Sequence, residues 1–261
     1  MTTTPLRAPT PPTAPARTDS PDRGAGFPEA PFLHLPPAFV EEALGAVPRE
    51  AAQRFTDSWH DLPADAYLGT DNPYRYRRYN AFRCTGTDLE RLPQRPFIQD
   101  RAVNGLVGGV PRTFAPLHPD VAEGAALRAV VRAFRGLLPA GDREAVDTCG
   151  VHQIRVVART DAAGDPAPEG IHQDGHHYVG QVLIRREGVL GAESRLYDLD
   201  RRQIHQARLT EPFESILLDD RRVFHDVSPV TASPGAGTGV RDMLLIDFFS
   251  RTEPTKGTSR D

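Results

Sequence analysis

Cysteine is scarce in this chain, with two residues among 261, and the two stand far apart. Neither Cys84 nor Cys149 belongs to a C-x-x-C pair, so the sequence predicts neither a disulfide framework nor a zinc site built on cysteine. A reducing cytoplasm is therefore the expected location. Histidine is more common, with nine residues, so any metal chemistry is expected to use imidazole and carboxylate ligands.

Long apolar segments and an excess of one charge are also lacking. No run approaches the roughly 18 apolar residues of a membrane span, and the first residues lack the basic and apolar regions of a signal peptide. The 31 Lys and Arg residues and the 35 Asp and Glu residues are mixed along the chain and give a net charge of −4. This balance argues against nucleic acid and membrane partners. A homodimer is compatible with the sequence, which does not determine the oligomeric state.

Proline, by contrast, is abundant and unevenly placed, because ten of the 25 prolines lie within residues 1–37. Almost no large apolar side chain precedes Phe27, and such a composition cannot offset the entropy lost on ordering. We therefore expect a disordered tail over residues 1–37, a single domain over 38–250 and a flexible C-terminal tail over 251–261.

The first part of the expected domain has helical spacing. Two segments, 39–44 and 50–59, show it most clearly. Asp120, with Glu123 three positions later, predicts a capping box. The apolar residues that follow repeat at spacings of three and one, which predicts a longer helix that ends near Leu138.

The spacing changes after Gly150, where apolar and polar residues alternate with a period of two. Segments bounded by Gly, Pro or Asp clusters predict seven strands, at 151–158, 178–186, 194–199, 204–210, 213–218, 222–227 and 240–249. Since no helix-length segment separates them, an antiparallel double sheet is favoured. The arginine-rich stretch 75–83 is better explained as a buried or pocket-facing strand than as a binder of single-stranded nucleic acid. The sequence thus predicts a mainly β fold in which N-terminal helices support a β-sandwich.

A cluster of candidate metal ligands follows the first of these seven strands. His172 and Asp174 are two positions apart, so in an extended backbone their side chains point to the same side. His225, in a later predicted strand, can supply a third ligand. Two histidines and one carboxylate on one face of an octahedral metal leave three positions open, as in the facial triad of non-haem Fe(II) oxygenases.

The residues around this cluster extend the pattern in both directions. It comprises His-Gln-Asp-Gly at 172–175, Arg-Arg at 185–186, and the segments 191–198, 218–225, 228–230 and 240–244, with 76–79, 97–99, Asn104 and 108–114 upstream. In order and spacing this pattern resembles the 2-oxoglutarate/Fe(II) dioxygenase family that includes the bacterial L-isoleucine 4-hydroxylase. The resemblance extends over residues 70–250 and leaves the tail and the first helices unmatched.

The resemblance implies that His172, Asp174 and His225 bind iron, and that Arg241 binds the distal carboxylate of 2-oxoglutarate. A guanidinium suits this role because it offers a bidentate fork and keeps its charge when buried. The implied fold is a double-stranded β-helix, a cupin-like jelly roll, which agrees with the seven predicted strands. One departure is a longer segment, 231–239, which affects the loop before Arg241 more than the arginine itself.

The resemblance also implies Fe(II) as cofactor, with 2-oxoglutarate and O2 as co-substrates. The implied activity is hydroxylation of an unactivated C–H bond in a free L-amino acid or close derivative, with release of succinate and CO2. Related halogenases have a small residue where this chain has Asp174, so the carboxylate favours hydroxylation, while desaturation stays open. The sequence does not name the amino acid, the carbon attacked or the stereochemistry.

Substrate contacts are expected on the strand before the metal cluster. Gln153 and Arg155 share one face of this otherwise apolar strand, which suggests a lined cavity. Arg155 is the first candidate for binding a substrate carboxylate, and an arginine on an exposed sheet face is the alternative. The further candidate contacts are Gln181, Arg77, Arg112 and Glu193.

Three other functions fit parts of the pattern. His172 and His176 have the H-x-x-x-H spacing of zinc metallopeptidases. That site needs a glutamate where this chain has Gln173, and a helix that Gly175 opposes. The same three ligands could hold a non-redox metal in an isomerase or hydrolase, against which Arg241 argues. A non-catalytic jelly-roll binding protein would retain the fold without the chemistry.

Overall fold

A seven-stranded antiparallel sheet forms the larger layer of the molecule, in the order β1-β9-β5-β12-β4-β2-β3. The computed structural model describes residues 27, 30–68, 73–99, 101, 105, 106 and 108–251. The strands of the larger sheet are β1 (Phe32–Leu35), β2 (Arg75–Thr85), β3 (Asp88–Arg91), β4 (Thr148–Arg159), β5 (Tyr178–Glu187), β9 (Ser215–Asp219) and β12 (Thr238–Phe249). Strands β4 and β12 are paired along their whole length near the middle of this sheet.

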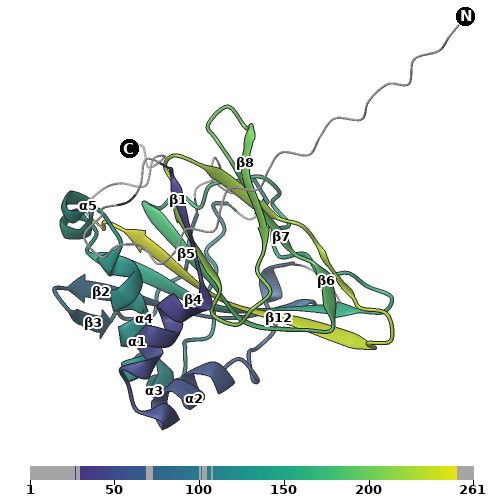
Figure 1. Cartoon of the computed structure of the whole chain (residues 1–261), viewed down its shortest axis with the longest axis horizontal. Helices are drawn as coiled ribbons and strands as arrows, with labels where there is room; N and C mark the ends of the chain where they lie inside the picture. Colours follow the sequence, from purple (N-terminus) through teal and green to yellow (C-terminus); the bar gives the residue numbers. More distant parts are fainter. Residues whose placement is uncertain are drawn as a thin grey trace, which may run out of the picture.

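A smaller antiparallel sheet lies across from the larger one. It contains β10 (Phe224–Val227), β7 (Glu193–Tyr197) and β8 (Gln203–Arg208), in that order, and β6 (Val189–Gly191) pairs separately with β11 (Val230–Ala232). Figure 1 shows β6, β7 and β8 on the side away from the helices. The two facing antiparallel sheets form the jelly roll that the family resemblance implies, which confirms the mainly β fold class.

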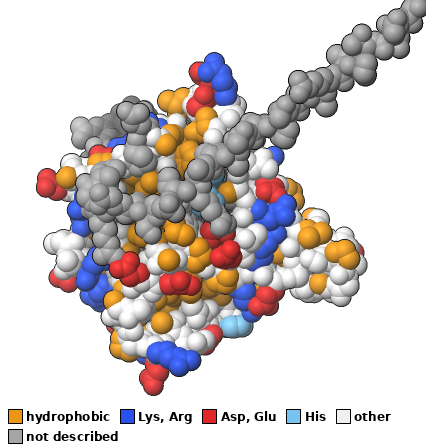
Figure 2. Space-filling view, in the orientation of Figure 1, with side chains coloured by type: hydrophobic (Ala, Val, Ile, Leu, Met, Phe, Trp, Pro, Cys, Tyr) orange, Lys and Arg blue, Asp and Glu red, His pale blue; other side chains and the backbone are white. Residues whose placement is uncertain are grey.

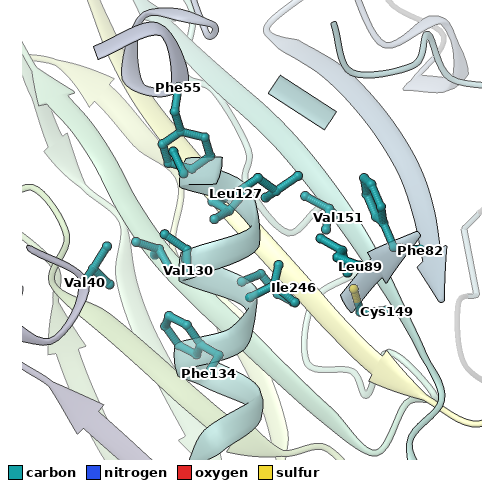
Figure 3. Close-up of a cluster of buried hydrophobic side chains, with 14 of the residues drawn as sticks. Val40, Phe55, Phe82, Leu89, Leu127, Val130, Phe134, Cys149, Val151 and Ile246 are labelled. Atoms are coloured by element: carbon teal, nitrogen blue, oxygen red, sulfur yellow. The ribbon is translucent and has the colours of Figure 1, made fainter. Parts of the chain in front are cut away.

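Helices cover one face of the larger sheet. They are α1 (Pro37–Gly45), α2 (Arg49–Asp57), α3 (Pro119–Ala122), α4 (Ala125–Gly136) and α5 (Ala140–Ala145), with a short 3-10 helix at Ala66–Leu68. Helix α4 buries Val130 and Phe134, which belong to one apolar cluster with Val151 and Ile246 of the sheet, and Figure 3 draws these side chains around the helix. Gly180 on β5 permits this close approach, because a Cβ there would lie 3.0 Å from the Phe134 ring. The apolar core therefore lies between the helices and this face of the sheet.

The single helix predicted from Asp120 is in fact two helices. Helix α3 ends at Ala122, and Gly124, with φ −72° and ψ 152°, separates it from α4. The predicted capping box does not form, because His118 and Gly124 are the N-cap residues and neither makes a side-chain cap hydrogen bond. A Cβ at Gly124 would lie 2.5 Å from the carbonyl oxygen of Asp120, so the turn between the two helices requires glycine.

The disordered tail expected over residues 1–37 includes residues that are ordered in the structure. Phe32–Leu35 form β1 and pair with β9, and α1 begins at Pro37, so ordered structure starts before residue 38. Prolines can flank an edge strand without interrupting its hydrogen bonds, which is why the proline-rich composition concealed β1. The rest of the expected N-terminal tail, apart from residues 27, 30, 31 and 36, lies outside the described residues, as does 252–261.

The seven strands predicted after Gly150 are all present, with ends shifted by a few residues. The arginine-rich stretch forms β2, which pairs with β4. Strands β1, β3, β6 and β11 were not predicted, because three or four residues are too few for a period of two to be recognised.

The surface carries charges of both signs. Figure 2 shows acidic and basic side chains interspersed over one face, with no continuous area of a single charge. Of the helices in the described part of the chain, none has the length and apolar character needed to span a bilayer.

Candidate active site

A cavity lies on the face of the larger sheet that the helices leave uncovered. Its empty space, including the open mouth, is about 910 Å³. The strand alternation of β12 explains its lining, because Arg241, Met243, Leu245 and Asp247 face the cavity while Leu244 and Ile246 face the helices. The smaller sheet contributes His225 from the opposite side.

Backbone pairing brings the predicted ligands together. His172 and His225 exchange backbone hydrogen bonds of 3.0 Å and 2.8 Å as a directly opposed antiparallel pair. Opposed residues point to the same side, so the centroids of the two rings are 4.4 Å apart. The Asp174 carboxylate oxygens lie 3.5 Å from Nε2 of His172 and 3.4 Å from Nε2 of His225. The ligand atoms of all three residues lie within 4.8 Å of one another.

This donor set fits a divalent metal. Nδ1 of His172 lies 2.8 Å from the carbonyl oxygen of Gly170, which fixes its proton there and leaves Nε2 free for a metal. Burial alone would lower the pKa of His172, but hydrogen bonding and the charge of Asp174 raise it to about 9. Burial would raise the pKa of Asp174, but the two imidazoles hold it well below its usual range. The site thus favours positive charge between these groups, as a metal ion supplies.

Asp220 holds the segment that carries Asp174 in place. Its buried carboxylate accepts hydrogen bonds from the backbone N–H groups of Asp174 at 3.0 Å, Gly175 at 2.8 Å and His176 at 3.0 Å. Gly175 has φ +82°, a left-handed conformation that lets the three N–H groups converge on one carboxylate. Sequence reasoning missed this role, because no spacing rule marks a residue that binds backbone N–H groups.

Arg241 lies in the same cavity and is 3% exposed. Within the described part of the chain its guanidinium has no hydrogen-bond or ion-pair partner, and its Nε is buried without an acceptor. Burial, and then the neighbouring charge of Arg186, lower the pKa of Arg241 to about 9. A buried charge without a counter-charge is costly, and a ligand carboxylate would supply both the charge and a bidentate partner.

Comparison with known proteins identifies the family. Residues 56–247 match the model of the 2OG-Fe dioxygenases. The chain belongs to this family. Membership implies Fe(II), 2-oxoglutarate and O2, in agreement with the His172, Asp174 and His225 cluster.

Individual relatives of this dioxygenase are distant. The 3(1)-hydroxy-L-isoleucine 4-dioxygenase of Pantoea ananatis (strain AJ13355) is 25% identical over 169 residues, and the match covers 61% of this chain and 66% of that enzyme, slightly less than two thirds of its length. A bsmA homolog from Methylobium petroleophilum PM1 is 29% identical with a TM-score of 0.75, over 87% of this chain and 92% of that chain. IDO from Bacillus thuringiensis shares the fold at 18% identity, with a TM-score of 0.68 over 85% and 94% of the two chains.

Two predicted substrate contacts of the dioxygenase lie on the wrong face of β4. Gln153 donates a hydrogen bond to the Ser58 hydroxyl, and Arg155 forms a bidentate pair with Asp242 at 2.7 Å and 2.8 Å. Both side chains lie opposite the cavity, so the expectation that they line it is wrong. The prediction took the more polar face of the strand for the ligand face, whereas the cavity face is the one that carries His152.

Three of the remaining substrate candidates do line the cavity of the dioxygenase, namely Gln181, Arg77 and Arg112. Glu193 is not part of the lining, and its carboxylate pairs with Arg208. The cavity therefore contains two groups of arginines, one at Arg241 and one around Arg77.

Proposed function

We propose that this dioxygenase hydroxylates an unactivated C–H bond of a free L-amino acid or close derivative, with release of succinate and CO2. The observation that carries the proposal is Arg241, a buried arginine without a partner in the described residues, in the same cavity as the ligand cluster. A metal site alone would fit an isomerase, a hydrolase or a binding protein. An unpaired guanidinium beside it adds a place for the distal carboxylate of 2-oxoglutarate.

Each residue of the site has a distinct role in this proposal. His172 and His225 would hold iron through Nε2, and Asp174 through its carboxylate. When bound, the iron supplies the oxidising chemistry with O2 and 2-oxoglutarate. Asp220 keeps the Asp174 backbone in position, and Arg241 orients the co-substrate. Because a carboxylate occupies position 174, hydroxylation is favoured over halogenation.

The apolar part of the lining suits an aliphatic side chain. Ile154, Val156 and Val227 line the cavity together with Met243 and Leu245. Such walls exclude water from the reacting carbon and accept hydrocarbon without offering it hydrogen bonds. This supports an aliphatic amino acid as substrate, which agrees in kind with the name of the Pantoea ananatis relative.

The charged part of the lining favours a substrate without net charge. The charge of Arg75 is balanced by Asp65, 2.9 Å away. The described lining then contains three other arginines and three carboxylates, namely Arg77, Arg112, Arg241, Glu169, Asp174 and Asp247. A divalent metal and dianionic 2-oxoglutarate cancel each other, so a zwitterion preserves the balance. A free amino acid is a zwitterion at neutral pH, whereas an N-acylated derivative would add a negative charge.

The decisive experiment is a turnover assay with a pool of free L-amino acids. Anaerobic protein is loaded with Fe(II), 2-oxoglutarate and the pool, and O2 is then admitted. We expect succinate and one pool member heavier by one oxygen atom, both measured by mass spectrometry. Omission of 2-oxoglutarate is the control and should prevent both products.

The alternative functions give different results in the same assay. A binding protein, an isomerase or a hydrolase forms no succinate under any condition. Absence of both succinate and oxidised amino acid, with iron shown to be bound, would contradict the proposal.

A further inference from the structure

A second cationic centre lies in the cavity apart from Arg241. Arg77 projects from β2 opposite Ile154, whereas Arg241 lies on β12 opposite Val156 of the intervening strand β4. The two arginines are thus two strands and two residues apart, which corresponds to about 12 Å between their Cα atoms. Arg112 lies beside Arg77, and the two are 2% and 8% exposed, respectively. One carboxylate group cannot occupy both cationic centres.

Two phenylalanine rings hold the guanidinium groups of this second centre. The central carbon of Arg77 lies 4.3 Å from the centroid of the Phe114 ring and 5.5 Å from that of Phe97. The central carbon of Arg112 lies 5.0 Å from the Phe97 centroid and 5.8 Å from that of Phe114. A ring face stabilises a cation and restrains its plane without cancelling its charge.

The hydrogen-bond partners of these arginines are neutral as well. Nε and Nη2 of Arg77 donate to Nδ1 of His152 at 3.2 Å and 2.6 Å. Nη2 of Arg112 donates to Oε1 of Gln99 at 2.6 Å, and its Nε is buried without an acceptor among the described residues. Arg75, which lines the same cavity, is paired directly with a carboxylate. Arg77 and Arg112 differ from it in having no carboxylate in contact within the part of the chain that the structure describes.

His152 accepts hydrogen bonds from Arg77 and thereby fixes the orientation of its guanidinium. Since Nδ1 accepts from Arg77, the ring proton lies on Nε2, which is 2.8 Å from Oδ2 of Asp247. Burial, and then the charge of Arg77, lower the pKa of His152 to about 4. The imidazole is therefore neutral near pH 7. It orients Arg77 and separates it from the Asp247 carboxylate.

This cationic centre is also close to the metal ligands. Gln99 accepts from Arg112 through Oε1, and its Nε2 lies 3.5 Å from Oδ1 of Asp174. Arg112 is therefore one glutamine side chain away from the ligand cluster. A small molecule held by Arg112 would have its carbon chain beside the metal.

We propose that Arg77 and Arg112 form the subsite that binds the carboxylate of the primary substrate, separate from the 2-oxoglutarate subsite at Arg241. The inference rests on the proposed function, which it deepens by assigning the substrate its own anion-binding residues. Glu169 and Asp247 are the cavity carboxylates outside the ligand cluster, and each has a second carboxylate oxygen besides the one near His172 or His152 to accept from the ammonium group.

The first test needs no mutation. The amino acid oxidised in the pool assay is compared with its carboxamide, which has the same shape without the negative charge. Wild-type protein should use the carboxylate with at least a 50-fold higher kcat/KM. Equal use of the two compounds would overturn the inference.

The second test uses Arg112→Gln, Arg112→Lys and Arg77→Gln, with Arg83→Gln as the matched control. Arg83 lies on the same strand as Arg77 and is exposed. In the glutamine variants at 77 and 112, KM for the amino acid should rise at least 30-fold, and the preference for carboxylate over carboxamide should fall toward one. Arg112→Lys should recover part of the loss, and Arg83→Gln should behave as wild type.

Binding of 2-oxoglutarate, followed anaerobically by the absorption of the Fe(II) complex, separates the two subsites. Its Kd should stay within threefold of wild type in all four variants. An unchanged KM for the amino acid in Arg112→Gln and Arg77→Gln would overturn the inference but not the proposed function. A Kd for 2-oxoglutarate that rises together with the KM would do the same. Absence of any turnover by wild-type protein would instead contradict the proposed function, and the inference with it.

Discussion

The two faces of the larger sheet are made by the same strands and have opposite chemistry. On the helix face, apolar side chains such as Val151 and Ile246 pack beneath α4, and the partly buried Arg155 is neutralised by the buried Asp242. On the cavity face, the arginines include Arg241, which lacks a carboxylate partner among the described residues. Arginines are present on both faces, so the difference lies in whether their charge is compensated.

This difference shows what distinguishes a ligand site from a structural polar pair. Arg241 and Asp242 are neighbours in sequence and point to opposite faces, as strand geometry requires. The carboxylate of Asp242 therefore pairs with Arg155 and cannot reach Arg241, whose guanidinium stays available to a ligand. Polar side chains on a buried strand do not by themselves mark a ligand site. A buried charge without a counter-charge in the protein is the more informative sign of one.

Loss of a metal ligand should have the largest effect on the cavity face. In His225→Ala, two of the three ligands remain, so we expect iron content to fall close to zero and succinate formation to fall at least about 100-fold. Iron is measured on desalted protein, and circular dichroism checks the fold. The control is His118→Ala, at a half-buried position outside the cavity lining. Wild-type iron content in His225→Ala would refute the ligand assignment.

Replacement of Arg241 should separate co-substrate binding from metal binding. Arg241→Gln removes the charge that faces the 2-oxoglutarate carboxylate. The Kd for 2-oxoglutarate should therefore rise about 10- to 100-fold, which corresponds to the free energy of a charge-assisted hydrogen-bonding pair. Iron content should not change. Unaltered affinity for 2-oxoglutarate would show that another cation binds the co-substrate.

Replacement of Arg155 should give the reverse pattern and so sharpen the contrast between the faces. Among the described residues, Arg155→Gln leaves the buried Asp242 with Arg185, at 3.0 Å, as its one charged partner. We expect the free energy of unfolding to fall by about 2 kcal/mol, less than for a fully orphaned buried charge. The Kd for 2-oxoglutarate should equal that of wild type. A selective loss of affinity for the co-substrate or the substrate would show that Arg155 contributes to ligand binding after all.

The smallest effect concerns His205, a buried histidine outside the cavity lining. Its ring packs 4.5 Å from Phe32, neither ring nitrogen has a hydrogen-bond partner in the described structure, and burial lowers its pKa to about 4. As pH falls below 6.5, the unfolded chain gains a proton that the folded chain does not, so stability falls. His205→Phe should reduce this loss between pH 7 and pH 5 by on the order of 1 kcal/mol.

Urea unfolding at the two pH values measures this effect, with 2-oxoglutarate affinity at pH 7 as the control for the cavity. Identical pH dependence in wild type and His205→Phe would show that His205 is hydrated or protonated in the folded state.

Local sequence patterns predicted the parts of the fold that depend on local geometry. The period of two located the seven strands after Gly150, and the spacing of His172 and Asp174 placed both side chains on one side. Elements that depend on distant contacts were not predicted. Strand β1 needs β9 as a partner, and the break at Gly124 depends on a close approach to the preceding turn.

The sequence by itself determined the ligand types, the strand periodicity and the presence of an arginine at 241, because these depend on residue identity and on spacing along one strand. Only the tertiary structure decided which face of each strand carries the cavity. Alternation states that Gln153 and His152 point to opposite sides, but the packing of α4 against Val151 and Ile246 selects the side that is filled with apolar groups. The other side carries the metal ligands and, among the described residues, an arginine without a carboxylate partner, Arg241.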